Sequence, residues 1–169
     1  MHPISLLLRL TVLAALLWLA VIDVRERRLP TRVVLSIGAL FFVDALFLRL
    51  PPAAFMTHGV LALGVFGVCA LLFAIRMLGG GDAKLAAVIF LWTGPNLALL
   101  ALTLISVLGG LVSFVSLATR NMDAHQSSSW KRALALFSGV RGVPYGLALA
   151  LGGGTVIVLP ALLPLFLTQ

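Results

Sequence analysis

Two aspartates, Asp23 and Asp82, are the residues of this sequence best suited to chemistry. Each stands at one end of a long apolar segment, and many residues separate them. Two carboxylates brought close together cannot easily both ionise, so such a pair can share a proton and divide the acid and base roles. The structural alternative is also open, because Asp82 after three glycines is a good N-cap for the helix that follows. An acidic group where an apolar segment ends is likewise common for structural reasons alone.

Three consecutive glycines, Gly79, Gly80 and Gly81, come directly before Asp82. Glycines let the backbone approach another chain closely and adopt φ values that other residues avoid. A loop that only had to cap a helix would not need all three. The run is not a phosphate-binding loop, because the Gly-Lys-Ser/Thr ending is absent. We therefore expect a close approach of a second chain to Asp82.

The composition determines where these residues must lie. Of the 169 residues 62% are apolar and 10% are charged, and the mean hydropathy is +1.18. Too little polar surface is available for a water-soluble domain, a disordered chain or a secreted scaffold. The net charge of +7 is explained by membrane topology, so we expect no nucleic-acid partner. The sequence predicts a small all-α polytopic membrane protein with a single transmembrane domain over residues 1–169.

Six membrane spans follow from the apolar segments and their breaks. The long uncharged stretch is divided at Gly94-Pro95-Asn96, because proline lacks a backbone donor and disfavours helix before it. Both termini are predicted outside, which leaves all of the 12 Lys and Arg except Arg9 and Arg49 on the cytoplasmic side. The predicted spans are about 4–22, 33–50, 59–75, 83–93, 97–118 and 143–167, with a cytoplasmic loop at 119–142.

This topology brings the two aspartates to one membrane face. Asp23 ends the first span, which descends to the cytoplasm, and Asp82 begins the fourth, which rises from it. Lys84 is two residues from Asp82, a spacing at which side chains on a helix do not face each other. We interpret Lys84 first as an anchor to the lipid headgroups. The apolar, basic-edged segment 130–137 is predicted to lie along the membrane surface.

Another acidic residue, Asp44, falls inside the second span. It lies roughly 18 Å from Arg32 along the helix, and Arg9 lies roughly 21 Å from Asp23 on the first span. Similar depth on antiparallel neighbours predicts an Arg9–Asp44 ion pair. The alternative is that Asp44 lines an internal water-filled cavity.

The remaining polar residues show no metal-binding pattern. The only cysteine is Cys69, so neither a disulfide nor a cysteine-based zinc site is expected. The histidines are scattered over termini and loops and do not have the spacing of metal ligands: His2, His58 and His125. No metal is therefore expected, and no histidine is given a role.

Three segments together resemble the prepilin peptidases, which are membrane aspartyl proteases of the GxGD type. They are Asp23 with its arginines and Leu29-Pro30, then Gly79 to Lys84, and last Val143-Pro144-Tyr145-Gly146. The small size and compact plan look most like the short subfamily that serves tight-adherence (Flp-type) pili. Family members usually have Asn where this chain has Thr31, whose hydroxyl we expect to cap the next helix.

The resemblance implies the function and the site. It implies an aspartic endopeptidase that removes the short cytoplasmic leader of type IV-like prepilins, at the cytoplasmic face of a bacterial inner membrane. It implies membrane lipids and the pilus assembly machinery as further partners, and no cofactor. Long members carry a cysteine-containing insertion and also N-methylate the pilin; without that insertion we do not expect methyl transfer. The implied residues are the catalytic Asp23 and Asp82, the substrate-approach glycines 79 to 81, and the supporting Lys84, Pro144, Tyr145 and Gly146.

Two other classes of function fit the sequence. A small proton- or cation-coupled transporter would use Asp23, Asp44 and Asp82 as cation sites, although no two halves of the chain repeat. A non-catalytic assembly subunit would tolerate loss of either carboxyl group.

Overall fold

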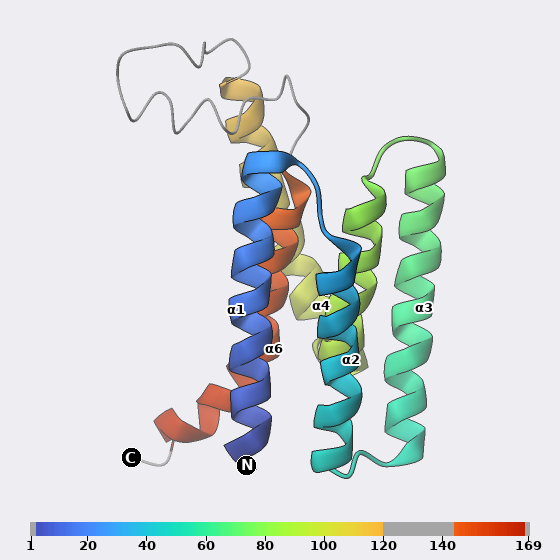
Figure 1. Cartoon of the computed structure of the whole chain (residues 1–169), viewed down its shortest axis with the longest axis vertical. Coiled ribbons are helices and arrows are strands. Elements are labelled where there is room, and N and C mark those ends of the chain that lie inside the picture. Colours follow the sequence, from blue (N-terminus) through green and yellow to red (C-terminus); the bar gives the residue numbers. More distant parts are fainter. Residues whose placement is uncertain (1–2, 120–143, 168–169) are drawn as a thin grey trace.

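The described part of the chain consists of apolar helices packed side by side (Figure 1). The computed structural model describes residues 3–119 and 144–167, with side chains as far as residue 162. Within these residues every regular element is helical, as predicted. The helices are α1 (Pro3–Glu26), α2 (Thr31–Phe47), α3 (Pro52–Ala74), α4 (Gly80–Ala118) and α6 (Tyr145–Leu167).

Four of these helices are long and apolar enough to cross a membrane, within α1, α3, α4 and α6. No residue of α3 is buried inside the protein, and most of its large apolar side chains are exposed. Such a surface would be costly in water and is satisfied by lipid. The chain is therefore a membrane protein, and six crossings with both termini outside stay a prediction. The predicted loop 119–142 lies outside the described residues, apart from Thr119, and so does the surface segment 130–137.

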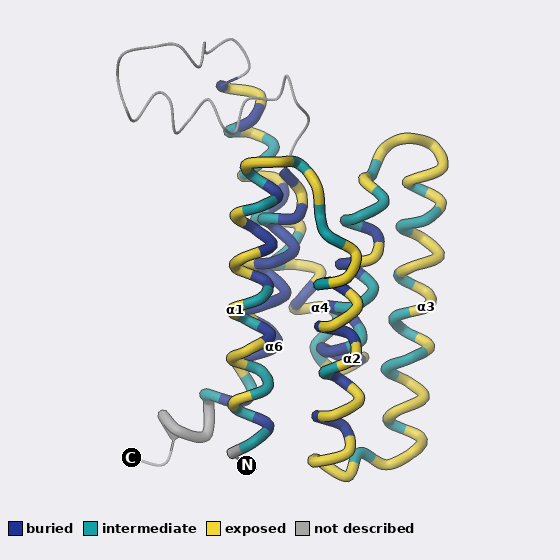
Figure 2. The backbone as a smooth tube through the Cα atoms, viewed as in Figure 1, coloured by how far each residue is buried: buried dark blue, intermediate teal, exposed yellow. Residues whose placement is uncertain are grey.

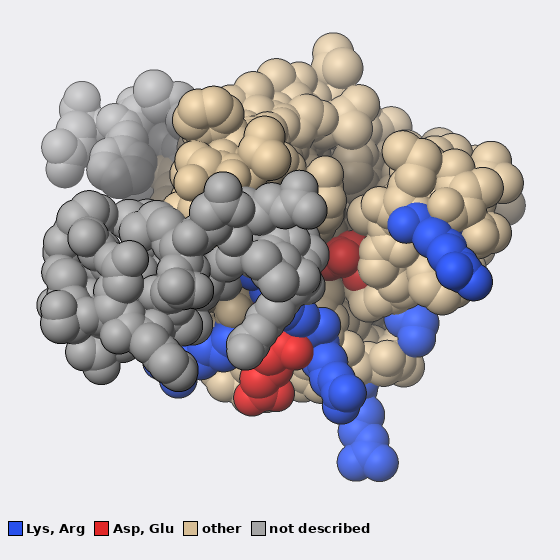
Figure 3. Space-filling model, turned by 90° about the horizontal axis from the view of Figure 1, so that it is seen from above, with Lys and Arg blue, Asp and Glu red and all other residues tan. Residues whose placement is uncertain are grey.

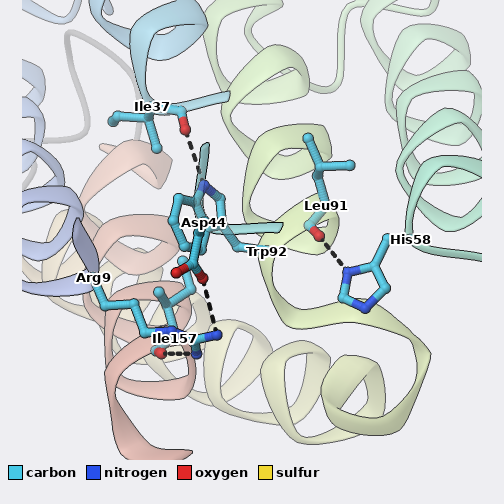
Figure 4. Close-up of polar contacts among 7 residues, drawn as sticks. All are labelled: Arg9, Ile37, Asp44, His58, Leu91, Trp92 and Ile157. Atoms are coloured by element: carbon cyan, nitrogen blue, oxygen red, sulfur yellow. Dashed lines mark hydrogen bonds and ion pairs between the residues drawn. The ribbon is translucent and has the colours of Figure 1, made fainter. Parts of the chain in front are cut away.

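α3 begins several residues before the third span that the sequence predicted. The predicted span begins at residue 59, whereas α3 begins at Pro52, so His58 lies within the helix. The ring of His58 is accommodated inside the helix bundle because its Nδ1 lies 2.7 Å from the carbonyl oxygen of Leu91 (Figure 4). That carbonyl is four residues before Pro95, which has no N–H to donate to it. His58 thus supplies the donor that the proline removes.

The break predicted at Gly94-Pro95-Asn96 lies inside α4. Gly94 has a non-helical backbone with φ 62° and ψ 179°, a region that favours glycine. Both ends of α4 lie toward the upper end of the molecule in Figure 1, so the chain reverses direction within this element. An added Cβ at Gly94 would also collide with the His58 ring. The kink therefore depends on glycine for its conformation and for space.

An ion pair inside the bundle fixes α1 against α2. Arg9 Nη2 lies 3.2 Å from Asp44 Oδ2, and Asp44 is only 2% exposed (Figure 4). Arg9 also donates to the carbonyl of Ile157 on α6 at 2.9 Å and lies 5.9 Å from the ring centre of Trp92. The Arg9–Asp44 pair predicted from helix depth is confirmed.

α6 packs between α1 and α4 and is largely buried (Figure 2). Its three consecutive glycines let neighbouring helices approach closely. Added Cβ atoms would lie 2.5 Å from Ile89 at Gly153, and 2.9 Å from Ile105 and Leu13 at Gly152 and Gly154. Small residues at such positions allow close packing of helices in lipid. This packing brings the beginning of α6 beside the end of α1.

Candidate active site

Asp23 lies in the last turns of α1 and is 6% exposed. The backbone N–H groups of Gly146 and Leu147, in the first turn of α6, face its carboxylate. Unpaired N–H groups and the positive end of the macrodipole make a helix N-terminus a favourable place for a carboxylate. An added Cβ at Gly146 would lie 2.7 Å from Asp23 Oδ2, so only glycine leaves room for this arrangement.

Asp82 lies in the first turn of α4, three residues after the N-cap Gly79. Its side chain reaches back to the backbone N–H of Gly79, which is half of a capping box. The interpretation of Asp82 as the N-cap itself is therefore wrong: the N-cap is Gly79, which has no side chain with which to cap the helix. A Cβ at Gly79 would lie 2.6 Å from Asp82 Oδ2. The carboxylate occupies the space that a side chain at position 79 would take.

The glycine run serves close packing rather than unusual backbone angles. None of the three glycines has a positive φ, so none of them needs to be glycine for its backbone angles. An added Cβ would lie 3.2 Å from the Phe73 ring at Gly80 and 2.9 Å from Leu29 Cβ at Gly81. Leu29 belongs to the connection between α1 and α2. The contact between Gly81 and Leu29 therefore draws the beginning of α4 toward the end of α1, where Asp23 lies.

The two aspartates are neighbours in the fold. The charge on Asp23 acts on Asp82, and the Arg27 guanidinium acts on Asp23. Asp23 Oδ2 and Asp82 Oδ1 are both buried and have no hydrogen-bond partner among the described residues. Buried polar atoms are rarely left unpaired, and a catalytic role is one explanation for such exceptions. The pair can thus present free carboxylate oxygens to a third group.

Charged groups surround this end of the molecule. Figure 3, seen from above, shows acidic atoms recessed between uncharged side chains, with Lys and Arg around them. Lys84 is exposed and donates from Nζ to Thr31 Oγ1 at 3.2 Å, which links the first turns of α4 and α2. The N-cap of α2 is Pro30 without a side-chain cap, so the prediction that Thr31 caps this helix was wrong.

An apolar cleft of about 630 Å³ opens beside Asp82, between α3, α4 and α6. Among the described residues that line it, Asp82 is the one charged residue. Tyr145 also lines it and is 38% exposed, with its hydroxyl 3.5 Å from Ser113 Oγ, while Pro144 before it is fully buried. No group of three or more metal-ligating side chains is found among the described residues. The arrangement is an acidic pair at one end of an apolar groove.

The sequence model of the type IV leader peptidase family matches residues 10–114, more than half of the chain. The chain belongs to the type IV leader peptidase family. The predicted resemblance is confirmed at this level, and the matched range includes both aspartates and the glycine run of this leader peptidase homologue. Comparison with curated proteins and with solved structures finds no match.

Two features of the site were not foreseen in the sequence. The contact of Gly146 with Asp23 joins residues from opposite ends of the chain, and only the resemblance marked Gly146. The cleft has no sequence signal, because its lining is ordinary apolar sequence. His58, which received no role, is bonded to the carbonyl of Leu91 just before the kink of α4. Pro95, four residues after Leu91, was the sequence feature that could have indicated this contact, because it leaves that carbonyl without a helical donor.

Proposed function

We propose that this protein is a membrane aspartic endopeptidase that removes the leader of type IV-like, Flp-type prepilins with Asp23 and Asp82. The observation that carries the proposal is the pairing of these two carboxylates. They come from separate helices, interact electrostatically, and each keeps a buried oxygen without a partner among the described residues. Membership of the leader peptidase family supports the reaction class.

The surroundings of the two carboxylates differ, and we assign their roles on that basis. Asp23 faces two N–H groups at a helix N-terminus and the positive charge of Arg27. Asp82 faces the apolar cleft and has one such N–H group, that of Gly79. Positive surroundings favour a carboxylate and an apolar wall favours a neutral acid. In our assignment, Asp23 takes a proton from the attacking water.

Asp82 then acts as the acid of the pair. Its proton polarises the scissile carbonyl and passes to the leaving amine as the carbon–nitrogen bond breaks. The water oxygen stays on the carbonyl carbon, so the products are a carboxylate and an amine. Gly79 to Gly81 would let an extended substrate backbone pass close to Asp82, and no cofactor takes part in these steps.

The distribution of charge supports an active site at the cytoplasmic face of a bacterial inner membrane. The basic residues near the aspartates in sequence and fold are Arg25, Arg27, Arg28, Arg32, Arg76 and Lys84. Arg9 and Arg49 lie toward the other ends of α1 and α2. Because cytoplasmic segments are enriched in Lys and Arg, the aspartate end is assigned to the cytoplasm. There the leader, the pilus assembly machinery and anionic lipids are accessible.

The transporter alternative finds no support. It required Asp44 as a cation site, whereas Asp44 is buried and paired with Arg9 at 3.2 Å. An acid that is already neutralised by an arginine is explained as a structural pair.

Co-expression with a Flp-type prepilin tests the proposal, with the pilin N-terminus read by mass spectrometry. We expect cleavage by the wild type and none by Asp23→Asn or Asp82→Asn. Glu26→Gln is the matched control, since Glu26 is an exposed acid one turn from Asp23, and it should cleave normally. Cleavage by both Asn variants would refute the two-aspartate mechanism and leave a non-catalytic role for the pair. A type IV prepilin of another class, processed while the Flp-type pilin is not, would refute the substrate assignment.

A further inference from the structure

The described lining of the cleft beside Asp82 combines an apolar wall with one carboxylate. Its lining includes Leu61, Val65 and Cys69 of α3, Phe90 and Leu102 of α4, and Leu149 of α6. A carboxylate that faces an apolar groove loses hydration without gaining a cation, which costs free energy. Ionisable residues in such surroundings usually have a function. The cleft is also continuous with the catalytic pair, because Asp82 belongs to both.

The depth of the cleft can be worked out from the helices that line it. Phe73 of α3 contacts Gly80 of α4, so these two residues lie at about the same level. The lining residues of α3 extend from Leu72 to Leu61, which is roughly 16 Å, or about three helical turns. At its far end the cleft is lined by Pro95, beside the kink of α4. An object in the cleft would thus extend from the catalytic level well into the membrane-spanning part of the protein.

We propose, on the basis of the peptidase function above, that the cleft binds the apolar helix of the substrate just after the cleavage site. A substrate whose scissile bond reaches Asp82 must place its adjoining segment next to the same wall. An amphipathic or apolar helix docks into such a groove through residues three and four positions apart, which share one face. The cleft therefore holds about three turns of the substrate helix against α3, α4 and α6.

The level of Cys69 makes this placement measurable. Cys69 is four residues before Phe73 and Asp82 is two residues after Gly80, so Cys69 lies roughly 3 Å deeper than Asp82. The charge of Asp82 acts on the Cys69 thiol, which agrees with their closeness. The substrate residues that contact Cys69 should then fall within the first two turns after the scissile bond.

Disulfide cross-linking in membranes tests the placement, because Cys69 is the only cysteine of the chain. Full-length Asp23→Asn enzyme is co-expressed with Flp-type prepilins that carry one cysteine each along their apolar helix. The membranes are then oxidised with copper phenanthroline. We expect cross-links in the first two turns, recurring every three or four positions, and none in the distal half of the helix.

A matched control places the thiol on the other side of α3. Gly67 is exposed, an added Cβ there meets no atom within 4 Å, and it lies two residues from Cys69. Cysteine introduced by Gly67→Cys, in a Cys69→Ala background, should cross-link at least tenfold less. Equal cross-linking from both positions, or none from Cys69, would overturn the placement. The cleft would then be assigned to lipid rather than to the substrate helix. Cleavage of each prepilin by wild-type enzyme is read in parallel: failure of all cleavage refutes the peptidase function, whereas cleavage without the Cys69 pattern refutes only the binding site.

Discussion

Gly146 offers a direct test of how the site is held together. A Cβ added at this position would lie 2.7 Å from Asp23 Oδ2 and 2.8 Å from its Cγ, whereas ordinary contact begins at 3.4 Å. In Gly146→Ala the Asp23 carboxylate must therefore move by about 0.7 Å, the difference between 3.4 and 2.7 Å. Gly146 is buried and α6 is packed on both sides, so the side chain rather than the helix is expected to yield.

A displacement of this size is large for a catalytic group. Misplacement by about 1 Å can cost about 100-fold in rate, so we expect kcat of Gly146→Ala to fall by about 10- to 100-fold. That range equals about 1.4 to 2.7 kcal/mol of lost transition-state stabilisation. The fold should survive, because alanine favours a helix over glycine by roughly 0.5–1 kcal/mol and offsets part of the strain.

The assay compares initial cleavage rates and thermal unfolding of purified enzyme in detergent. Gly110→Ala is the matched control, since Gly110 is an exposed glycine of α4 and a Cβ there meets nothing within 4 Å. It should cleave at the wild-type rate. If Gly146→Ala unfolds like the wild type and also cleaves at the wild-type rate, then the position of Asp23 against α6 does not govern catalysis.

Three further predictions concern the other contacts. Gly79→Ala should lower kcat about tenfold or more with little change in unfolding temperature, because its Cβ would lie 2.6 Å from the Asp82 carboxylate; unchanged kcat would contradict this. Asp44→Asn should lower the free energy of unfolding by about 3–5 kcal/mol by leaving the partly buried Arg9 without its anion, and Asp44→Leu with Arg9→Leu should recover much of that loss in denaturant titrations. His58→Ala should cost about 1–3 kcal/mol by leaving a partly buried carbonyl of α4 unpaired, and an unfolding temperature equal to wild type would show that this bond is dispensable.

Several features of the fold were accessible from the sequence because they depend on the bilayer and on local backbone chemistry. Hydropathy identifies the membrane protein since the bilayer selects apolar helices of sufficient length. The turn in α4 was predicted because Pro95 has no N–H and disfavours helix at the residue before it. That residue, Gly94, has φ 62° in the structure, a value that glycine adopts without penalty. Arg9 and Asp44 were paired from depth alone, since rise per residue fixes the level of a side chain along a helix.

The lateral arrangement of the helices was decided only in the tertiary structure. Depth placed Asp23 and Asp82 at one end of the molecule, but the contacts of Gly146 with Asp23 and of Gly81 with Leu29 make them neighbours. The same packing leaves Thr31 to accept a hydrogen bond from Lys84 rather than to cap its helix. Such choices depend on which side chains of distant segments fit together, and in lipid that fit is a matter of close packing between surfaces that are equally apolar. Hydropathy is the same for every such surface. It therefore predicts how deep in the membrane a residue lies but not which residues it packs against.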